Sequence, residues 1–503
     1  MRMVNSLLES TSQKKSQNPA IVFADRIMTY AEVDTMANQC AHGLRALGIR
    51  QGDMVGILLP NSPEFIIAYF GIIKAGATVV PMNPMLSPDE LHYIMNDAGL
   101  KVVFTIPPLL AGIEHIAPQI KTLRDVIVTG EKSQPFGISF RQLLGGMHST
   151  SPGISVENTQ AAVCIYTSGT TGHPKGALLT HRNLLSNVAS ILRVFSTHET
   201  DAFSCILPLF HAYSATVCML MPVSIGARIV VFDSFVPRKC LQAIHDHRIT
   251  VFVGVPAMFA VLGHLKNTND YDVSSLRFCV AGGAPLPAEV LETFESIYKV
   301  KIYEGDGPTE CSPVTSVNPI GGKRKVGSIG LPVPDVEMKI VDDEGNDLPP
   351  NQVGEIVVRG PNVMKGYLNQ PKATDEAIVN GWFHTGDVGK MDDEGYFYIL
   401  DRKKDMMIVG GLNVYAQEVE TALKAHPTVL EAAVIGKPDK LRGEVPVAYL
   451  VPSEGKTIEP DELIRFCRAH LAKYKVPREF IARESLPKTA TGKVMKWKLK
   501  GEV

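Results

Sequence analysis

Residues 167–176, TSGTTGHPKG, are the part of the chain best suited to chemistry. Glycines and small hydroxyl side chains allow backbone N–H groups and hydroxyls to approach a phosphate closely, and Lys175 adds a point charge. The segment is not a Walker A loop, because Pro174 stands directly before the lysine and no Ser or Thr follows it. A surface loop of the same composition is the alternative interpretation.

A second chemical segment, GDGPTE, covers residues 305–310. Thr309 offers a hydroxyl donor, and Glu310 offers a carboxylate, the ligand type that a hard cation such as Mg²⁺ prefers. Glycines on both sides of Asp306 indicate backbone that passes close to a ligand. The alternative is a solvated turn after a short strand, with Glu310 as an ordinary surface carboxylate.

Alternating strand-like and helix-like segments must position these residues. The β-branched run 163–166 predicts a buried strand, and residues 62–77 predict a helix with Ser62 as its N-cap and a proline just inside. Another helix is expected from about Asn183. This rhythm predicts an α/β fold in which parallel sheets carry helices on both faces.

The pattern changes after about Gly327, where alternation and turn signals predict a β-rich subdomain at about 327–400. We expect a large N-terminal domain over 1–400, a charged connection at 401–405 and a small α+β C-terminal domain over 406–503. From residue 401 onward the chain has 19 Lys and Arg against 14 Asp and Glu, and the part before it has 31 against 38. This asymmetry favours separate domains and a polyanionic ligand, with a solvated basic face as the alternative.

Composition excludes several classes of protein. The 503 residues carry 50 Lys and Arg against 52 Asp and Glu, so no global charge indicates a nucleic-acid partner. The eight cysteines are scattered without zinc-ligand spacing and are expected to be buried free thiols. Neither a signal core nor a transmembrane segment is predicted, so a cytoplasmic location is expected.

Taken in order, the two segments and five others resemble the adenylate-forming family, which includes acyl-CoA synthetases, coumarate-CoA ligases, luciferases and peptide-synthetase adenylation domains. The five others are PLFHAY (208–213), AGGAPL (281–286), GWFHTGDVG (381–389), DRKKDMMIVGGLNVYAQEVE (401–420) and LPKTATGKVMK (486–496). The resemblance covers nearly the whole chain. Residues 366–387, GYLNQPKATDEAIVNGWFHTGD, and the compact length resemble bacterial fatty-acyl-CoA synthetases most closely.

The resemblance implies a reaction in two steps. A carboxylate attacks the α-phosphorus of ATP to give an acyl-adenylate and pyrophosphate, and the thiol of CoA then displaces AMP. ATP, Mg²⁺ and CoA are therefore expected, and catalysis would rest on positioning and electrostatics. The resemblance also implies that the small C-terminal domain is mobile and rotates at Lys404 between the steps.

An ATP site follows from the same resemblance. Thr309 and Lys493 would contact the α-phosphate, Asp387 and Arg402 would hold the ribose, and Glu310 would hold Mg²⁺ together with Thr170. The expected ATP- and AMP-binding residues are Thr167, Ser168, Gly169, Thr170, Thr171, Gly172, Gly283, Ala284, Glu304, Gly305, Asp306, Gly307, Thr309, Asp387, Arg402 and Lys493, and the expected catalytic residues are Lys493, Thr309, Glu310, His211 and Lys175.

The acid and CoA would bind through other motifs. His211 would position or gate the carboxylate rather than act as a base, since a carboxylic acid is already ionised at neutral pH; a structural histidine is the alternative. The expected acyl pocket comprises His211, Val255, Gly282, Gly283, Ala284, Ser312 and Pro313, and the expected CoA site comprises Gly410, Gly411 and Lys475.

We expect a medium- or long-chain fatty acid as the substrate, with an aryl acid such as benzoate or coumarate as the alternative. An adenylation enzyme that loads a carrier protein shares every ATP motif. A nucleotide-binding protein without catalysis is a further alternative, which Lys175, Glu310, Asp387 and Lys493 argue against. A homodimer and peripheral contact with a membrane are both compatible with the sequence.

One position departs from the family pattern. The family usually has Gly-aromatic-Gly-x-Thr-Glu, in which the aromatic ring packs on adenine, whereas this chain has Asp306 in the aromatic position and Pro308 in the variable one. An aspartate cannot stack, so we expect it to accept a hydrogen bond from the adenine amino group instead.

Overall fold

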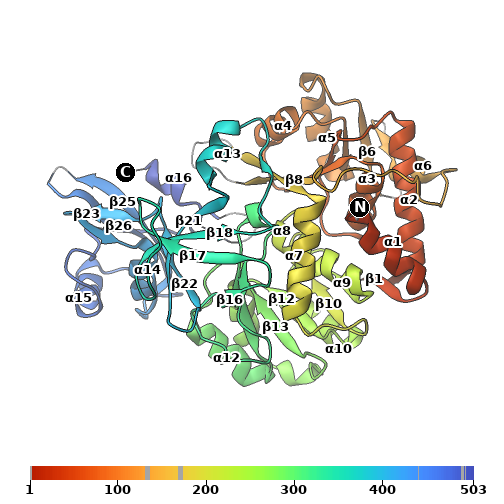
Figure 1. Cartoon of the computed structure of the whole chain (residues 1–503). Helices are drawn as coiled ribbons and strands as arrows, with labels where there is room; N and C mark the ends of the chain where they lie inside the picture. Colours follow the sequence, from red (N-terminus) through yellow and green to blue (C-terminus); the bar gives the residue numbers. More distant parts are fainter. Residues whose placement is uncertain are drawn as a thin grey trace. The chain divides into compact units, whose positions relative to one another are not determined.

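The computed structural model describes residues 3–130, 136–167, 174–439, 441–488, 492 and 494–502. The chain divides into two compact units, Met1–Met338 with Val358–Phe383, and Lys339–Val357 with His384–Val503 (Figure 1). The expected domain limits, with a connection at 401–405, stay a prediction.

We call residues 167–176 the phosphate-loop segment, and the sheet whose strands flank it belongs to the first unit. Its described strands run in the order β19 (Gly366–Tyr367), β9 (Lys175–Thr180), β8 (Ala161–Thr167), β4 (Thr78–Pro81), β3 (Met54–Ile57), β5 (Val102–Thr105), β6 (Asp125–Val128) and β7 (Ile138–Ser139). From β8 to β7 neighbouring strands are parallel, and β9 and β19 continue the sheet with antiparallel pairing.

The sheet that carries the GDGPTE segment also belongs to the first unit. Its described strands run in the order β16 (Leu331–Pro332), β15 (Ser316–Val317), β14 (Ile302–Asp306), β13 (Phe278–Ala281), β12 (Val251–Gly254), β10 (Ala202–Cys205), β11 (Arg228–Val231), β1 (Pro19–Phe23) and β2 (Arg26–Thr29). The run from β14 to β1 is parallel. Both sheets confirm the predicted α/β fold.

Helices of this unit connect and cover the two sheets (Figure 1). The longer ones are α1 (Asn5–Lys14), α2 (Tyr30–Ala46), α3 (Pro63–Lys74), α4 (Pro88–Asp97), α5 (Pro107–Ile116), α7 (His181–Val194), α10 (Pro237–His247), α11 (Pro256–Gly263), α12 (Ala288–Tyr298) and α13 (Pro371–Ala377). One apolar core joins both sheets to most of these helices and includes Ile57, Phe65, Val163, Phe252 and Ile302. The helices α4 and α5 pack in a second apolar cluster.

Capping side chains fix where the helices begin. Ser62 accepts a hydrogen bond from the Phe65 amide and confirms the predicted N-cap of α3. Helix α7 begins at His181 rather than at about Asn183, because Thr180 accepts the Asn183 amide in a capping box. The helix therefore follows the strand β9 directly.

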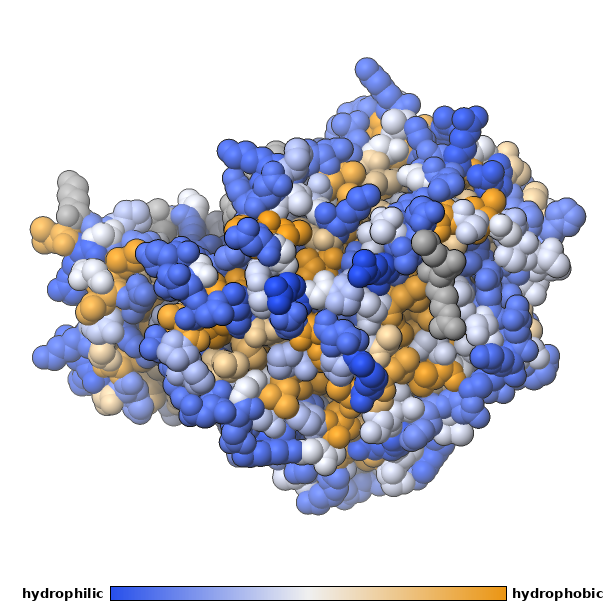
Figure 2. All heavy atoms as spheres, in the orientation of Figure 1, coloured by the Kyte–Doolittle hydropathy of each residue, from blue (hydrophilic) through white to orange (hydrophobic). Residues whose placement is uncertain are grey.

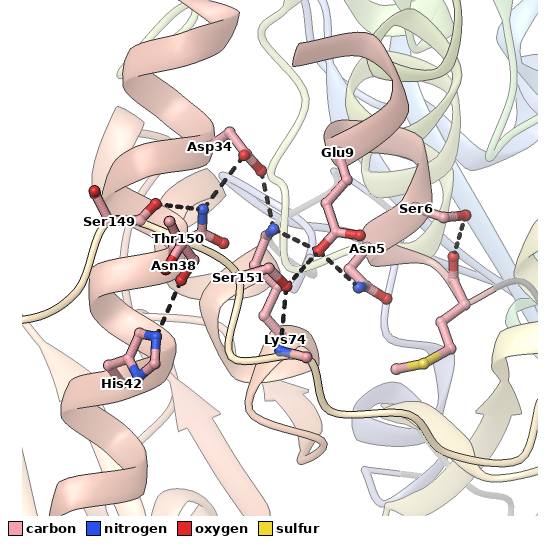
Figure 3. Close-up of polar contacts among 12 residues, drawn as sticks. Asn5, Ser6, Glu9, Asp34, Asn38, His42, Lys74, Ser149, Thr150 and Ser151 are labelled. Carbon is pink, nitrogen blue, oxygen red and sulfur yellow. Dashed lines mark hydrogen bonds and ion pairs between the residues drawn. The ribbon is translucent and has the colours of Figure 1, made fainter. Parts of the chain in front are cut away.

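Lys74, at the end of α3, is fully buried. Its Nζ lies 2.7 Å from Glu9 Oε1 on α1 and 2.9 Å from Asp34 Oδ1 on α2 (Figure 3). Burial alone would raise the pKa of Glu9, but hydrogen bonding and the charge of Lys74, with hydrogen bonds from Asn5 and Ser151, lower it. The charge of Lys74 is thus compensated, and three helices are joined at one buried atom.

The predicted β-rich region is confirmed by a sheet of β17 (Glu337–Val341), β18 (Gly354–Arg359), β21 (Trp382–Met391) and β20 (Ile378–Val379), with β22 (Phe397–Arg402) paired to β21. The C-terminal part of the second unit has a sheet of β24 (Leu412–Val414), β23 (Met407–Val409), β26 (Gly443–Pro452), β25 (Val429–Asp439) and β27 (Glu479–Ala482). Its helices are α14 (Ala416–Lys424), α15 (Pro460–His470) and α16 (Lys496–Lys500).

All eight cysteines are free and buried, which confirms that prediction. Among the described residues, no helix combines the length and the apolar character needed to cross a membrane. Figure 2 shows hydrophilic and hydrophobic residues interspersed on the viewed face.

Candidate active site

The strands β8 and β9 bring Thr167 and Lys175 opposite each other. The two residues are direct partners in the antiparallel register and flank the segment between them. Ser168, Gly169, Thr170, Thr171 and Gly172, which were predicted to contact phosphates, lie outside the described residues. The antiparallel pairing therefore brings the two described ends of the segment 167–176 next to each other.

Two hydroxyl groups converge on one oxygen of Glu310. Thr167 Oγ1 donates to Glu310 Oε1 over 3.2 Å, and Tyr367 OH donates to the same atom over 3.0 Å. The Glu310 carbonyl accepts from the Met364 amide at 2.7 Å. Residues of the first unit thus fix both the carboxylate and the backbone of Glu310.

Tyr367 was not predicted to belong to the site. Its ring lies 5.2 Å from Lys175 Nζ, measured to the ring centroid, so it contacts the phosphate-loop lysine and Glu310 at once. Burial, the charge of Glu310 and this hydrogen bond raise the pKa of Tyr367, so the phenol stays a donor at neutral pH. Tyr367 stands in the GYLN string that carried the resemblance, but nothing in that string indicates its partner.

The predicted Mg²⁺ ligands can be tested against this arrangement. Within the described ranges, no cluster of three or more His, Cys, Asp or Glu side chains could form a metal site from protein alone. Mg²⁺ is commonly held by one or two carboxylates together with substrate phosphates. A single oriented carboxylate, Glu310, fits that mode, because its partner Tyr367 also contacts the phosphate-loop lysine Lys175. The other predicted ligand, Thr170, lies outside the described residues.

The glycines around Asp306 are required by the packing of the chain itself. A Cβ at Gly307 would lie 1.5 Å from the Pro313 carbonyl oxygen, and one at Gly305 would lie 2.8 Å from that of Ser316. The expected reason for these glycines, close approach of a nucleotide, is therefore not needed to explain them. The Asp306 carbonyl accepts hydrogen bonds from the amide and the hydroxyl of Thr315.

Glu304 is a buried carboxyl group on β14. Its Oε1 accepts the Leu286 amide at 2.9 Å and so connects β14 to the end of the AGGAPL segment. Burial raises the pKa of Glu304 to about 7, with a contribution from the charge of Asp306, against the opposing effect of the Leu286 bond. Glu304 can therefore change its protonation near neutral pH.

The predicted acyl-pocket residues lie on neighbouring segments of the first unit. His211 Nδ1 accepts the Tyr213 amide at 3.3 Å and caps α8 (Ala212–Ser214), which leads into the π-helix η2 (Ala215–Leu220). A Cβ at Gly282 would lie 3.3 Å from the Tyr213 ring, and one at Gly283 would lie 3.8 Å from Val255 Cγ1. Single-turn π-helices often occur beside functional sites.

Two other predicted pocket residues, Ser312 and Pro313, make contacts inside the first unit. Ser312 is fully buried, and its hydroxyl donates to the Asn362 carbonyl at 2.8 Å. Its own carbonyl accepts from Thr216 Oγ1 at 3.1 Å, which joins the GDGPTE region to η2. Pro313 follows it and provides the carbonyl that crowds Gly307.

The predicted ribose ligands are paired in the second unit. Asp387 and Arg402 are register partners on β21 and β22, and Arg402 Nε lies 2.8 Å from Asp387 Oδ1. Arg402 also donates to the Thr385 carbonyl at 3.2 Å. The pair orients a nearly buried carboxylate, whose oxygens only accept hydrogen bonds and so suit a vicinal diol.

The predicted CoA residues also lie in the second unit. Gly410 and Gly411 have positive φ angles of 61° and 82° at the turn between β23 and β24, where a Cβ would meet no neighbouring atom within 4 Å. Lys475 Nζ lies 2.6 Å from Glu418 Oε1. Lys404 is exposed, and Lys493 lies outside the described residues.

Comparison with protein families gives two matches. Residues 8–368 match the family described as AMP-binding enzyme, and residues 418–493 match the AMP-binding enzyme C-terminal domain.

Individual proteins similar to this chain support the same family assignment. The chain is 36% identical over 531 residues to a long-chain-fatty-acid–CoA ligase of Bacillus subtilis, covering 99% of this chain and 94% of the relative. It is 37% identical over 477 residues to a feruloyl-CoA synthase of an Amycolatopsis species, covering 95% and 93%. The crystal structure of an anthranilate CoA ligase with anthranoyl-AMP superposes with a TM-score of 0.92 at 31% identity, covering 100% of this chain and 97% of that one.

Proposed function

Because the chain belongs to the family of AMP-binding enzymes, we propose that it is an ATP-dependent acyl-CoA synthetase that activates a medium- or long-chain fatty acid. It would form an acyl-adenylate with release of pyrophosphate and then transfer the acyl group to CoA with release of AMP. The observation that supports the proposal is that Tyr367 contacts both Glu310 and Lys175, while Thr167 donates to the same Glu310 oxygen.

In the first step the protein must hold a triphosphate near a carboxylate of the same charge. Lys175 and the loop after Thr167 would bind the departing phosphates, and Thr309 would donate its hydroxyl to the α-phosphate. Bound at Glu310, Mg²⁺ would neutralise phosphate charge. Lys493 would add a second cation at the α-phosphate, and none of these groups needs to change its covalent state.

In the second step the protein must admit a thiol to the acyl-adenylate. Asp387, oriented by Arg402, would keep the ribose in place. Gly410 and Gly411 would provide a narrow backbone passage for the pantetheine arm, and Lys475 would contact a CoA phosphate after leaving Glu418. Rotation of the small domain at Lys404 would exchange these groups with Lys493.

A fatty acid is preferred because the chain is similar over nearly its full length to long-chain-fatty-acid–CoA ligases. An aryl acid is the second candidate, supported by the feruloyl-CoA synthase and the anthranilate CoA ligase. The test is CoA-dependent release of AMP from ATP with octanoate, palmitate, oleate, benzoate and ferulate at equal concentrations. Preference for the two aryl acids over all three alkanoates would refute the first choice.

The carrier-protein alternative requires a separate assay. The enzyme is incubated with ATP and its preferred acid, and pyrophosphate release is measured with and without free CoA. We expect CoA to accelerate turnover and acyl-CoA to accumulate. Formation of adenylate with no transfer to free CoA would instead support loading of a carrier protein.

A further inference from the structure

The last helix, α16, touches the segment at which the small domain is proposed to rotate. Lys500 Nζ donates to the Lys404 carbonyl at 3.0 Å and lies 3.3 Å from Asp405 Oδ1. One turn earlier on the same helix, Lys496 Nζ lies 2.7 Å from Glu420 Oε1. The C-terminal helix therefore reaches the proposed hinge through Lys500, and Lys496 joins the same helix to α14.

Both groups that Lys500 contacts lie on the C-terminal side of the Lys404 Cα, the point about which the small domain is proposed to rotate. The Lys404 carbonyl belongs to the same planar peptide group as the Asp405 nitrogen, so rotation about either dihedral of Lys404 moves both together. Lys500 can thus stay bonded while the small domain turns. By contrast, the amides of Asp405 and Met406 donate to the Arg402 carbonyl across the hinge, and these bonds must break during rotation.

Lys496 and Leu499 hold α16 in place independently of Lys500. Burial alone would lower the pKa of Lys496, but the charges of Glu420 and Asp401 outweigh it and raise that pKa, so the lysine stays charged. Leu499 is buried in an apolar cluster with Tyr449, and its carbonyl accepts from the Tyr449 hydroxyl at 3.4 Å. Removal of the Lys500 amine should therefore leave the helix docked.

Helix α16 also ends the segment in which the predicted catalytic lysine stands. The Met495 amide donates to the Pro487 carbonyl at 2.8 Å, and Lys488 and Val494 form an isolated β-bridge. The paired residues at the two ends of this segment therefore lead directly into α16, the helix that contacts the hinge.

We propose that Lys500 is a positioning residue that clamps the peptide group between Lys404 and Asp405 to α16, so that domain rotation is confined to the two dihedrals of Lys404. The clamp makes the first peptide group after the hinge part of the same rigid body as α16. This inference rests on the proposed two-step function, which provides the reason for rotation.

The test compares K500M with K500R, which can still donate to a carbonyl and a carboxylate, and with K498M. Lys498 lies on the same helix over the Trp497 ring, so K498M removes a charge and a trypsin site from α16 without touching the hinge contacts. Trypsin cleaves after Arg402, Lys403 and Lys404, and the rate of cleavage there is followed by mass spectrometry. Steady-state kcat and the KM for ATP are measured in parallel.

We expect K500M to be cleaved at the hinge about fivefold faster than wild type, because the peptide group after Lys404 is released to open locally. Its kcat should fall about threefold while its KM for ATP stays within about twofold, since rotation rather than ATP binding is affected. K500R and K498M should behave as wild type. The clamp would be refuted if trypsin cleaved the hinge of K500M at the wild-type rate. It would also be refuted if K498M were cleaved there as fast as K500M.

Failure of the proposed function would look different. If wild-type protein forms no acyl-CoA from any acid, the two-step function is refuted, and the cleavage comparison still decides whether Lys500 holds the hinge peptide. If wild type forms acyl-CoA and the cleavage rates do not differ, only the clamp is refuted.

Discussion

The phenol of Tyr367 donates a hydrogen bond to Glu310 Oε1 over 3.0 Å, and this bond joins two segments 57 residues apart. Thr167 donates to the same oxygen, so the proposed metal ligand is held from two directions. A carboxylate that is fixed in advance loses less freedom when it binds a cation and a phosphate. Tyr367 therefore helps to orient Glu310 for the proposed binding of Mg²⁺ and phosphate.

Y367F should weaken the use of Mg²⁺ without removing the contact between the ring and Lys175. A hydrogen bond to a charged group contributes about 1.5–3 kcal/mol, so the half-saturating Mg²⁺ concentration should rise roughly tenfold. The measurement is a Mg²⁺ titration of pyrophosphate release at saturating ATP. Y298F is the matched control, because it removes a phenol bonded to the Leu262 carbonyl away from the site. An unchanged Mg²⁺ titration in Y367F would contradict the role.

Replacing Lys74 by methionine should destabilise the first unit. Removing one partner of a buried ion pair leaves its partners uncompensated and typically costs about 3–5 kcal/mol. Here two carboxylates, Glu9 and Asp34, would lose the same cation. The free energy of unfolding in urea measures the effect, and K372M, which alters an exposed pair with Glu376, should change it by less than about 1 kcal/mol. A loss in K74M as small as in K372M would refute the prediction.

Local signals in the sequence predicted the fold well. Ser62 caps α3 as expected because capping depends on a few neighbouring residues. The strand before the phosphate-loop segment was predicted at 163–166 and found at Ala161–Thr167, since a short β-branched run between polar segments leaves few alternatives. Helix α7 begins two residues before the predicted Asn183, because Thr180 caps it.

Contacts between distant segments could not be predicted. Lys74 looks like an ordinary charged residue at a helix end, and only packing of α1 and α2 against α3 places Glu9 and Asp34 around it. Tyr367 lacked a role for the same reason, since its partner is fixed by the tertiary structure. Gly307 was predicted to lie close to a nucleotide, but the contact that requires a glycine there is with the Pro313 carbonyl, which depends on the folded turn.

Glu304 should make stability depend on pH near neutrality. Its pKa is raised from 4.5 to about 7 by burial, so the folded state binds a proton that the unfolded state releases. The stability that protonated Glu304 contributes is fully present below pH 4.5, the pKa of the unfolded state, and is lost as the pH rises through about 7, the pKa of the folded state. E304Q keeps an acceptor for the Leu286 amide but has no proton to release. Between pH 5 and pH 8 its free energy of unfolding should therefore rise relative to that of wild type by on the order of 1–3 kcal/mol.

The check is urea unfolding of both proteins at the two pH values. E289Q, an exposed carboxylate on α12, is the control and should show the same pH dependence as wild type. A difference between E304Q and wild type that does not change with pH would show that Glu304 is ionised throughout this range.

Asp306 should recognise the adenine amino group in place of an aromatic ring. We expect D306A to raise the KM for ATP roughly tenfold, because a hydrogen bond to a charged acceptor is lost. D306Y should hold or lower that KM by restoring a ring that can stack. Inosine triphosphate is the discriminating substrate, since its base has a carbonyl where adenine has the amino group, and an acceptor cannot bond an acceptor. Wild type should prefer ATP, and D306A should lose the preference. An unchanged KM for ATP and an unchanged preference in D306A would make Asp306 a bystander.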